Sequence, residues 1–216
     1  MVMPGQFLER ATLIPVAGVV MEGVSHRGRL QPPLLVLPPR PEDGGGMDHV
    51  VGAELAWAAS QAGHPTLRFN HRGVGASQGE RSGGEDLVED VLSALLVAGE
   101  NAGHPRPAVA AAGGACATAL EVLRRHPERI SGVCLISPGA LDAADVPEVG
   151  VPVLLVLGSE QPTVGRVALA SAIAAAGGAL ELIEGADAGW IRGLPQLGQA
   201  VAAWLSGLGR AGGAIP

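Results

Sequence analysis

Lysine and tyrosine are absent from the 216-residue sequence, and aromatic residues make up only 2% of it. All 14 basic residues are therefore arginines; they are scattered along the chain, and the formal net charge is −7. A phosphate-binding surface needs clustered positive charge, and single-stranded nucleic acid needs aromatic side chains on which bases stack. We therefore expect no nucleic-acid partner.

Cysteine and long apolar runs are also scarce. The two cysteines, Cys116 and Cys134, are too few for a disulfide framework and lie in apolar stretches, which indicates free buried thiols in a reducing compartment. The longest apolar run, residues 151–157, is far shorter than the roughly 20 residues that span a bilayer. The first ten residues lack the basic and then apolar pattern of a signal peptide. We expect a cytoplasmic protein with no membrane partner.

The remaining composition indicates a folded domain. Hydrophobic residues make up 47% of the chain and charged residues 16%, the reverse of the balance in disordered chains. Glycine occurs 33 times and proline 17 times without a fixed period, which excludes collagen-like and solenoid repeats. No linker divides the chain, so we predict a single domain over residues 1–209 and a frayed tail over residues 210–216.

Apolar runs of strand length alternate with stretches of helical periodicity. This alternation predicts βαβ units, and hence a mostly parallel central sheet with helices on both faces. The first two strands are too close for a crossover, so they are expected to pair antiparallel. Asp48 is placed to cap the first helix. The predicted strands are 11–17, 18–24, 33–37, 66–69, 108–112, 130–136, 151–157 and 179–183, and the predicted helices are 48–62, 86–98, 115–125, 164–176 and 194–208.

Ligands of such sheets bind beyond the carboxyl ends of the strands. Five loops are expected there: 38–47, 70–80, 113–115, 158–163 and 184–192.

Three segments in these loops form a recognisable pattern. Residues 38–48 read PPRPEDGGGMD, residues 69–79 read FNHRGVGASQG, and EGADAGW at 184–190 precedes an apolar helix that ends in AWL at 203–205. Over residues 20–207 the chain resembles the α/β-hydrolase superfamily. It is most similar to small lidless bacterial hydrolases of the dienelactone-hydrolase-like and carboxylesterase-like type, with HPHPxxGGxMD, FNxRGVGxSxG and GADHFF segments. The resemblance implies an α/β-hydrolase fold without a lid domain and without a cofactor.

The resemblance also implies a catalytic triad of serine, acid and histidine in that chain order. The serine position falls at Gly113 or, with a gap, at Ala115. The acid position falls at Gln161, next to Glu160, and the histidine position at Ala188.

Two counts do not depend on how these positions are aligned. No serine occurs between Ser93 and Ser131, and the last histidine of the chain is His126. An alanine cannot accept the proton of a nucleophile. The sequence therefore predicts the frame of a hydrolase without its triad.

Cys116 is the substitute nucleophile that the sequence offers, because it lies near the start of a predicted helix. Its alternative role is that of a small core residue. His71 is either a general base or a solvated loop residue, and Arg72 either clamps an anionic ligand or ties its loop to neighbouring carboxylates. His49 and Asp48 diverge at a helix start with no third ligand at a suitable spacing, so no metal site is expected.

A ligand-binding pocket is expected between the loops. Gly44–Gly46 could offer backbone N–H groups to an anion there, and Trp190 either walls the pocket or fills the space left by smaller residues. The predicted lining residues are Pro38, Arg40, Gly45, Arg72, Gly114 and Trp190.

Three hypotheses of function follow. The first is a degenerate hydrolase that acts by binding a small acyl or ester-like ligand or a protein partner, including a second copy of itself. The second is an ester or thioester hydrolase with a relocated mechanism that uses Cys116. The third is a structural or assembly subunit whose pocket is filled.

Overall fold

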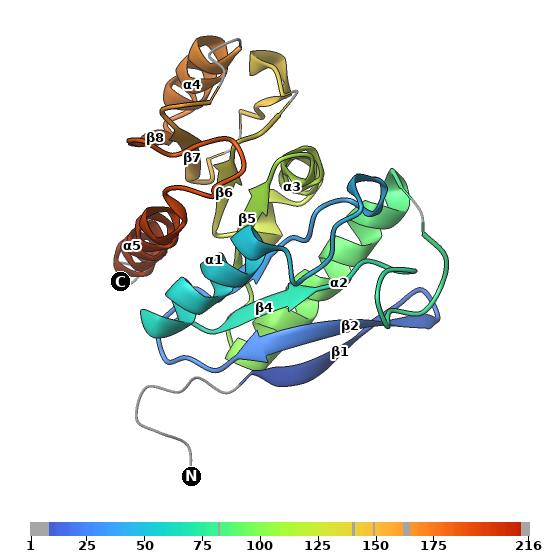
Figure 1. Cartoon of the computed structure of the whole chain (residues 1–216). Helices are drawn as coiled ribbons and strands as arrows, with labels where there is room; N and C mark the ends of the chain where they lie inside the picture. Colours follow the sequence, from blue (N-terminus) through green and yellow to red (C-terminus); the bar gives the residue numbers. More distant parts are fainter. Residues whose placement is uncertain (1–8, 82, 140, 149, 162–164, 213–216) are drawn as a thin grey trace.

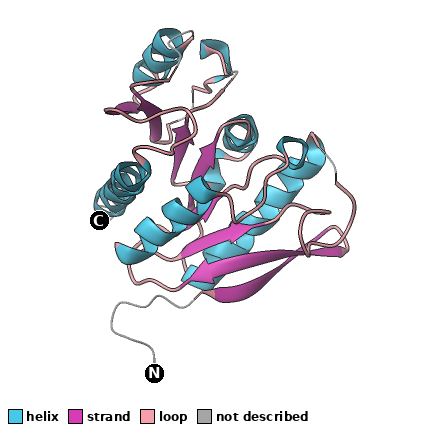
Figure 2. Cartoon of the chain, viewed as in Figure 1, coloured by secondary structure: helices cyan, strands magenta, loops and turns pink. Residues whose placement is uncertain are grey.

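Eight strands form one sheet in the computed structural model, which describes residues 9–81, 83–139, 141–148, 150–161 and 165–212 (Figures 1 and 2). The strand order is β1-β2-β4-β3-β5-β6-β7-β8. The strands are β1 (Arg10–Val16), β2 (Val19–His26), β3 (Leu34–Val36), β4 (Thr66–Phe69), β5 (Ala108–Ala112), β6 (Gly132–Ile136), β7 (Val153–Gly158) and β8 (Ala179–Ile183).

The pairing of the strands confirms the predicted topology. β1 pairs antiparallel with β2, and β2 pairs antiparallel with β4, whereas every other pair is parallel. Strands β3, β4, β6 and β7 are buried along their whole length. Continuous apolar runs such as Leu34–Val36 arise because helices cover both faces of a parallel sheet.

The five helices are α1 (Val50–Gln61), α2 (Glu85–Ala102), α3 (Ala115–Arg125), α4 (Arg166–Ala175) and α5 (Leu194–Gly212). One core cluster joins the sheet to α2, α3 and α4, and a second cluster joins the opposite face to α1 and α5. Figure 1 shows α1 and α5 on one side of the sheet and α2 and α3 on the other. None of the described helices is both long and apolar enough to cross a bilayer.

Some predicted boundaries are wrong. The first helix begins at Val50, and its N-cap is His49, with no side-chain cap hydrogen bond. Asp48 does not cap it, because its Oδ1 accepts a hydrogen bond of 2.7 Å from Arg68 Nη1. The predicted frayed tail begins too early, because residues 210–212 continue α5, and the rest of that prediction, residues 213–216, lies outside the described residues.

Candidate functional site

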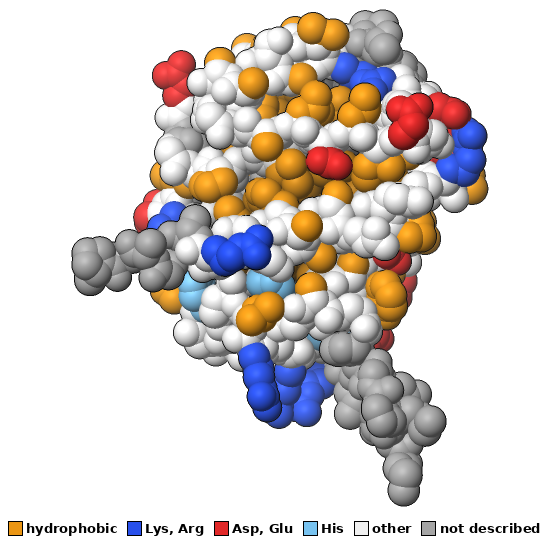
Figure 3. Space-filling model, turned by 90° about the vertical axis from the view of Figure 1, so that its left-hand side faces the viewer, with side chains coloured by type: hydrophobic (Ala, Val, Ile, Leu, Met, Phe, Trp, Pro, Cys, Tyr) orange, Lys and Arg blue, Asp and Glu red, His pale blue; other side chains and the backbone are white. Residues whose placement is uncertain are grey.

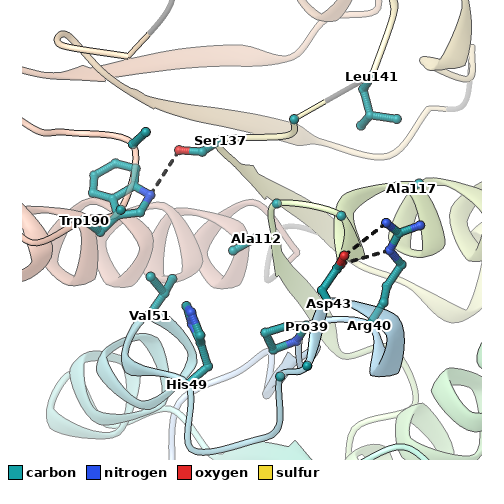
Figure 4. Close-up of a pocket in the computed structure, with 17 residues that line it drawn as sticks. Pro39, Arg40, Asp43, His49, Val51, Ala112, Ala117, Ser137, Leu141 and Trp190 are labelled. Atoms are coloured by element: carbon teal, nitrogen blue, oxygen red, sulfur yellow. Dashed lines mark hydrogen bonds and ion pairs between the residues drawn. The ribbon is translucent and has the colours of Figure 1, made fainter. Parts of the chain in front are cut away.

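A cavity of about 610 Å³ opens at the carboxyl ends of the central strands (Figure 4). It lies between the loop after β3, the start of α1, the β5–α3 turn, the loop after β6 and the loop after β8. Its volume is within the range of small-molecule sites. The lining residues are Pro39, Arg40, Asp43, Gly44, Gly45, His49, Val51, Ala112, Gly113, Gly114, Ala117, Ser137, Gly139, Leu141, Ala188, Gly189 and Trp190.

The turn from β5 into α3 places Gly113 at its tip. The φ angle of Gly113 is +56°, a left-handed conformation that disfavours residues with a Cβ atom. Its N–H donates to the carbonyl oxygen of Ile136 at 2.9 Å, and a Cβ atom at this position would have no atom within 4 Å. Ala115, in contrast, is buried in the first turn of α3 and does not line the cavity. Gly113 therefore occupies the position that a nucleophile at this turn would take.

Cys116 does not lie in this site. It is fully buried in the core, and its Sγ donates to the carbonyl oxygen of Ala111 at 3.2 Å. Burial raises the pKa of its thiol to about 12. A thiol without access to the cavity and without a readily formed thiolate cannot serve as the substitute nucleophile. The core role of Cys116 accounts for its position.

The loops after β6 and β7 meet at Ser137. Gln161 Nε2 donates to Ser137 Oγ at 2.6 Å and to the carbonyl oxygen of Asp187 at 3.3 Å. Trp190 Nε1 also donates to Ser137 Oγ, at 3.0 Å (Figure 4). Gln161 and Trp190 are among the residues that the sequence predicts at the site, whereas Ser137 is not, because the five predicted loops do not include the residues after the strand 130–136. The position of Ser137 directly after a buried strand is the signal that could have found it.

Trp190 is a wall of the cavity. Its side chain is 3% exposed, lines the cavity and has a φ angle of +58°. It does not fill the space beside Gly113 and Ala188, since all three residues line the same open volume.

The loop after β8 is organised by Asp187 rather than by a histidine. Asp187 Oδ1 accepts hydrogen bonds from the N–H groups of Gly189 and Ile191, and Oδ2 accepts one from the N–H of Arg192. Desolvation opposes ionisation of this carboxyl group, but the hydrogen bonds from Ile191 and Arg192 outweigh it and lower its pKa. Ala188 lines the cavity with a methyl group alone. The neighbouring Glu160 forms an ion pair with Arg192 and does not line the cavity.

The loop after β3 brings an ion pair to the cavity. Arg40 Nε donates to Asp43 Oδ2 at 3.1 Å, and Arg40 Nη1 lies 2.7 Å from Glu42 Oε1. A Cβ atom on Gly114 would lie 2.6 Å from Asp43 Oδ2 and 2.7 Å from Arg40 Nε, so this pair packs directly on Gly114. Gly45 lines the cavity as predicted. Pro38 does not, because it is buried and the next residue, Pro39, faces the cavity instead.

Arg72 does not line the cavity either. Its Nε donates to Asp90 Oδ1 at 2.7 Å and its Nη2 to Glu89 Oε2 at 2.7 Å, so it ties its loop to helix α2. His71 is 2% exposed, and its Nδ1 lies 3.1 Å from Asp90 Oδ2. Neither predicted role is observed, because the His71 side chain is buried instead of solvated and does not line the cavity as a general base would. Within the described ranges, no group of three or more His, Cys, Asp or Glu side chains could hold a metal ion.

Solved structures share this architecture. A putative alpha/beta hydrolase from Agrobacterium tumefaciens matches with a TM-score of 0.77 and 21% identity, covering 95% of this chain and 98% of its own. An alpha-beta serine hydrolase homologue from Coxiella burnetii matches with a TM-score of 0.76 and 22% identity, covering 91% and 97%. A serine hydrolase without lid from Xanthomonas campestris matches with a TM-score of 0.73 and 19% identity, covering 95% and 98%. At these identities the matches establish the fold alone.

A search of curated proteins finds no significant match. The amino-acid sequence does match a family model, described as serine aminopeptidase, S33. The match covers residues 43–157, from the loop after β3 through the Gly113 turn to β7. The chain therefore has the α/β-hydrolase fold and belongs to the serine aminopeptidase S33 family of hydrolases.

Proposed function

We propose that this α/β hydrolase has lost its catalytic triad and acts by binding a small, largely apolar ligand without turning it over. The observation that carries the proposal is the open cavity. Glycine and alanine occupy the positions of the nucleophile and the histidine, and the space in front of them remains free, with a volume of about 610 Å³. The hypothesis of a structural subunit expects a filled pocket, and this open volume does not support it.

The charges around the β5–α3 turn come from an ion pair. Asp43 Oδ2 and Arg40 Nε both lie beside Gly114, whose N–H has no acceptor among the described residues and could serve as an oxyanion donor. Because the guanidinium offsets the carboxylate, these charges neither favour nor oppose acyl transfer, and the proposal rests on the open cavity and on the residues at positions 113 and 188.

The test is a panel of p-nitrophenyl esters and thioesters with acyl chains from acetyl to octanoyl. We expect wild-type protein to hydrolyse them no faster than a heat-denatured sample. A Cys116→Ala variant is the control for the relocated mechanism and should behave identically. Turnover in the wild type that disappears in this variant would establish Cys116 as the nucleophile, and turnover in both proteins would reveal a catalytic arrangement other than the triad.

A Gly113→Ser variant sharpens this test. The free space around Gly113 can accept the serine side chain, and the left-handed backbone costs about 1–2 kcal/mol. Because Ala188 stands where the base belongs, we expect this variant to remain at background as well. Hydrolysis by Gly113→Ser alone would mean that a base other than a residue at position 188 operates in the cavity.

A second candidate function, interaction with a protein partner, is favoured by the exposed edge strand β8. Leu180 and Leu182 are 49% and 51% exposed, and Figure 3 shows hydrophobic side chains gathered on the side of the molecule where β8 lies. The opposite edge strand, β1, carries Arg10 and Pro15, and charged residues and proline on an edge strand disfavour pairing with another chain. Sedimentation of the wild type and of Leu182→Lys tests this candidate. A larger species that Leu182→Lys dissociates would support it, and a wild-type monomer at all concentrations would exclude self-association.

A further inference from the structure

The hydrogen bonds of Ser137 leave its hydroxyl proton without an acceptor. A serine hydroxyl accepts up to two hydrogen bonds and donates one. Both neighbours of Ser137 Oγ are donors, Trp190 Nε1 at 3.0 Å and Gln161 Nε2 at 2.6 Å. The indole N–H can only donate. Both acceptor sites of the hydroxyl are therefore occupied, and no described residue accepts its proton.

The orientation of the Gln161 amide is fixed by a second bond. Nε2 also donates to the carbonyl oxygen of Asp187 at 3.3 Å. A flipped amide would place its oxygen against this carbonyl oxygen, which is repulsive. Gln161 thus stays a donor toward Ser137, and the hydroxyl proton cannot turn back to it.

Ser137 lies beside open space. Ser137 lines the main cavity and also an adjoining cavity of about 240 Å³, and both volumes share Gly139, Leu141 and Ala188. A donor without a protein partner at the wall of an open cavity is available to an acceptor that enters the cavity, either water or a ligand group.

The backbone is strained at the two residues that build this donor. Among the described residues only three that are not glycine have a positive φ angle, and two of them are Ser137 at +44° and Trp190 at +58°. Each such conformation costs about 1–2 kcal/mol. Strain of this kind persists where surrounding structure holds a side chain in a functional orientation. Here the two strained residues are joined by one hydrogen bond at the wall of the cavity.

The charges of the lining indicate a neutral acceptor. Each of the two volumes is lined by one arginine: Arg40, which is paired with Asp43 and Glu42, and Arg166, which donates to the carbonyl oxygens of Gln161 and Gly158. The Asp43 carboxylate also lines the cavity and repels a second negative charge. Val51, Leu141 and the ring of Trp190 offer apolar surface to the rest of a ligand.

We infer that the Ser137 hydroxyl, held by Gln161 and Trp190, donates a hydrogen bond to a carbonyl oxygen of a neutral, mainly apolar ligand such as an ester, lactone or ketone. This inference rests on the proposed binding function and names the ligand class for the same site. Ser137 is the group that touches the ligand. Gln161 is a positioning residue that keeps the hydroxyl proton directed at the cavity.

The test compares three probes of matched shape: acetophenone, ethylbenzene, in which a methylene group replaces the carbonyl, and benzoate, which is charged. Binding is followed by the shift of the Trp190 indole N–H resonance, assigned through Trp57→Phe and Trp204→Phe variants. We expect the wild type to bind acetophenone and ethylbenzene and not to bind benzoate measurably.

Two variants separate the donor from the shape of the cavity. Ser137→Ala removes the hydroxyl, and Gln161→Glu keeps the hydroxyl but offers it a carboxylate acceptor, so its proton turns away from the cavity. Each change should lower the affinity for acetophenone relative to ethylbenzene about five-fold, the value of one net hydrogen bond of ~1 kcal/mol. Ser159→Ala is the matched control, because the Ser159 hydroxyl bonds to Gly185 outside the cavity, and it should leave the ratio unchanged.

The outcomes distinguish failure of the Ser137 inference from failure of the proposed binding function. If acetophenone and ethylbenzene bind but the ratio of their affinities is the same in all four proteins, Ser137 does not bind the carbonyl group, while the binding function stands. Binding of benzoate as tight as that of acetophenone would also overturn the neutral ligand class. If no probe shifts the Trp190 resonance of the wild type, the proposed binding function fails, and the inference fails with it.

Discussion

Two groups of loops lie at the same edge of one sheet and are built in opposite ways. The loop after β4 is held by charged and polar side chains: Asp90 of α2, fully buried, binds His71 and Arg72, and Asn70 binds Glu22 at 2.7 Å. The loops around the cavity, in contrast, present mostly glycine, alanine and backbone. Their side-chain networks are the hydrogen bonds of Asp187, the ion pairs of Arg40, and the bonds that converge on Ser137.

This difference separates the frame of the fold, meaning the loop after β4 and the core on which it packs, from the site, meaning the loops around the cavity. The loop after β4 does not line the cavity, so we expect its side chains to act in stability, because a buried carboxylate is tolerated only with its partners in place. The cavity loops contain no fully buried carboxylate of this kind among their lining residues, so we expect substitutions there to cost less. Substitutions in the two regions should therefore differ in cost, and the following predictions test this from the largest expected effect to the smallest.

Replacement of Asp90 by alanine should have the largest effect. It leaves the His71 ring and the Arg72 guanidinium without their buried acceptor, and the loss of one partner from a buried pair costs about 3–5 kcal/mol. Urea denaturation followed by far-UV circular dichroism measures this loss. Asp86→Ala, at an exposed carboxylate 3.4 Å from the same arginine, is the control and should cost less than about 1 kcal/mol. Equal effects of the two substitutions would show that Asp90 does not anchor the loop.

Two glycines with similar backbone angles offer a matched pair. Gly73 has a φ angle of +70°, and a Cβ atom there would lie 2.3 Å from the backbone nitrogen of Arg81. Gly113 has a φ angle of +56° and free space around it. Gly113→Ala should cost only the left-handed strain of about 1–2 kcal/mol, whereas Gly73→Ala adds a steric clash and should cost about 2–5 kcal/mol.

Thermal and urea unfolding of these two variants compare the frame with the site directly. Similar losses of stability in both would mean that the space around Gly113 closes in solution, and the distinction between a packed loop and an open cavity would not hold at these positions.

Sequence alone predicts the regular elements of the fold well. The ranges of β4, β5, α3 and β8 agree with the structure residue for residue, because each is bounded by glycine, proline or a change of periodicity. The family resemblance assigns the serine position to Gly113 or Ala115 and the histidine position to Ala188, and in the structure Gly113 and Ala188 line the cavity whereas Ala115 does not.

Contacts between distant segments could not be read from the sequence in the same way. Neither role predicted for His71, general base or solvated loop residue, anticipates its partner Asp90, which lies 19 residues away on α2. The sequence does contain a signal for this contact. Asp90 follows Leu87 by three residues, which places its carboxylate on the buried face of α2, where a carboxylate needs a partner. Ser137 meets Gln161 and Trp190 across 24 and 53 residues, and no local pattern encodes such a meeting.

Trp190→Phe should have a smaller effect on stability than the substitutions in the frame. It keeps an aromatic wall and removes one neutral hydrogen bond, to Ser137, which is worth about 1 kcal/mol. Trp57, which is 54% exposed, provides the matched control, and Trp57→Phe should leave stability unchanged within about 0.5 kcal/mol. A loss above about 3 kcal/mol for Trp190→Phe would place this residue in the frame instead of the site.

The smallest effect at neutral pH concerns Cys116, which lies close to the site in sequence but belongs to the frame. Because burial raises the pKa of its thiol to about 12, the folded protein holds this proton at pH 8, and Ellman's reagent should not label the thiol until urea unfolds the chain. A raised pKa in the folded state also means that the group contributes stability below its unfolded value near 8.5 and loses it as the pH rises toward 12. Unfolding at a fixed urea concentration should thus become easier above about pH 9, and less so in Cys116→Ala. Rapid labelling at pH 8 without urea would place the thiol on an accessible surface and return it to the candidates for a nucleophile.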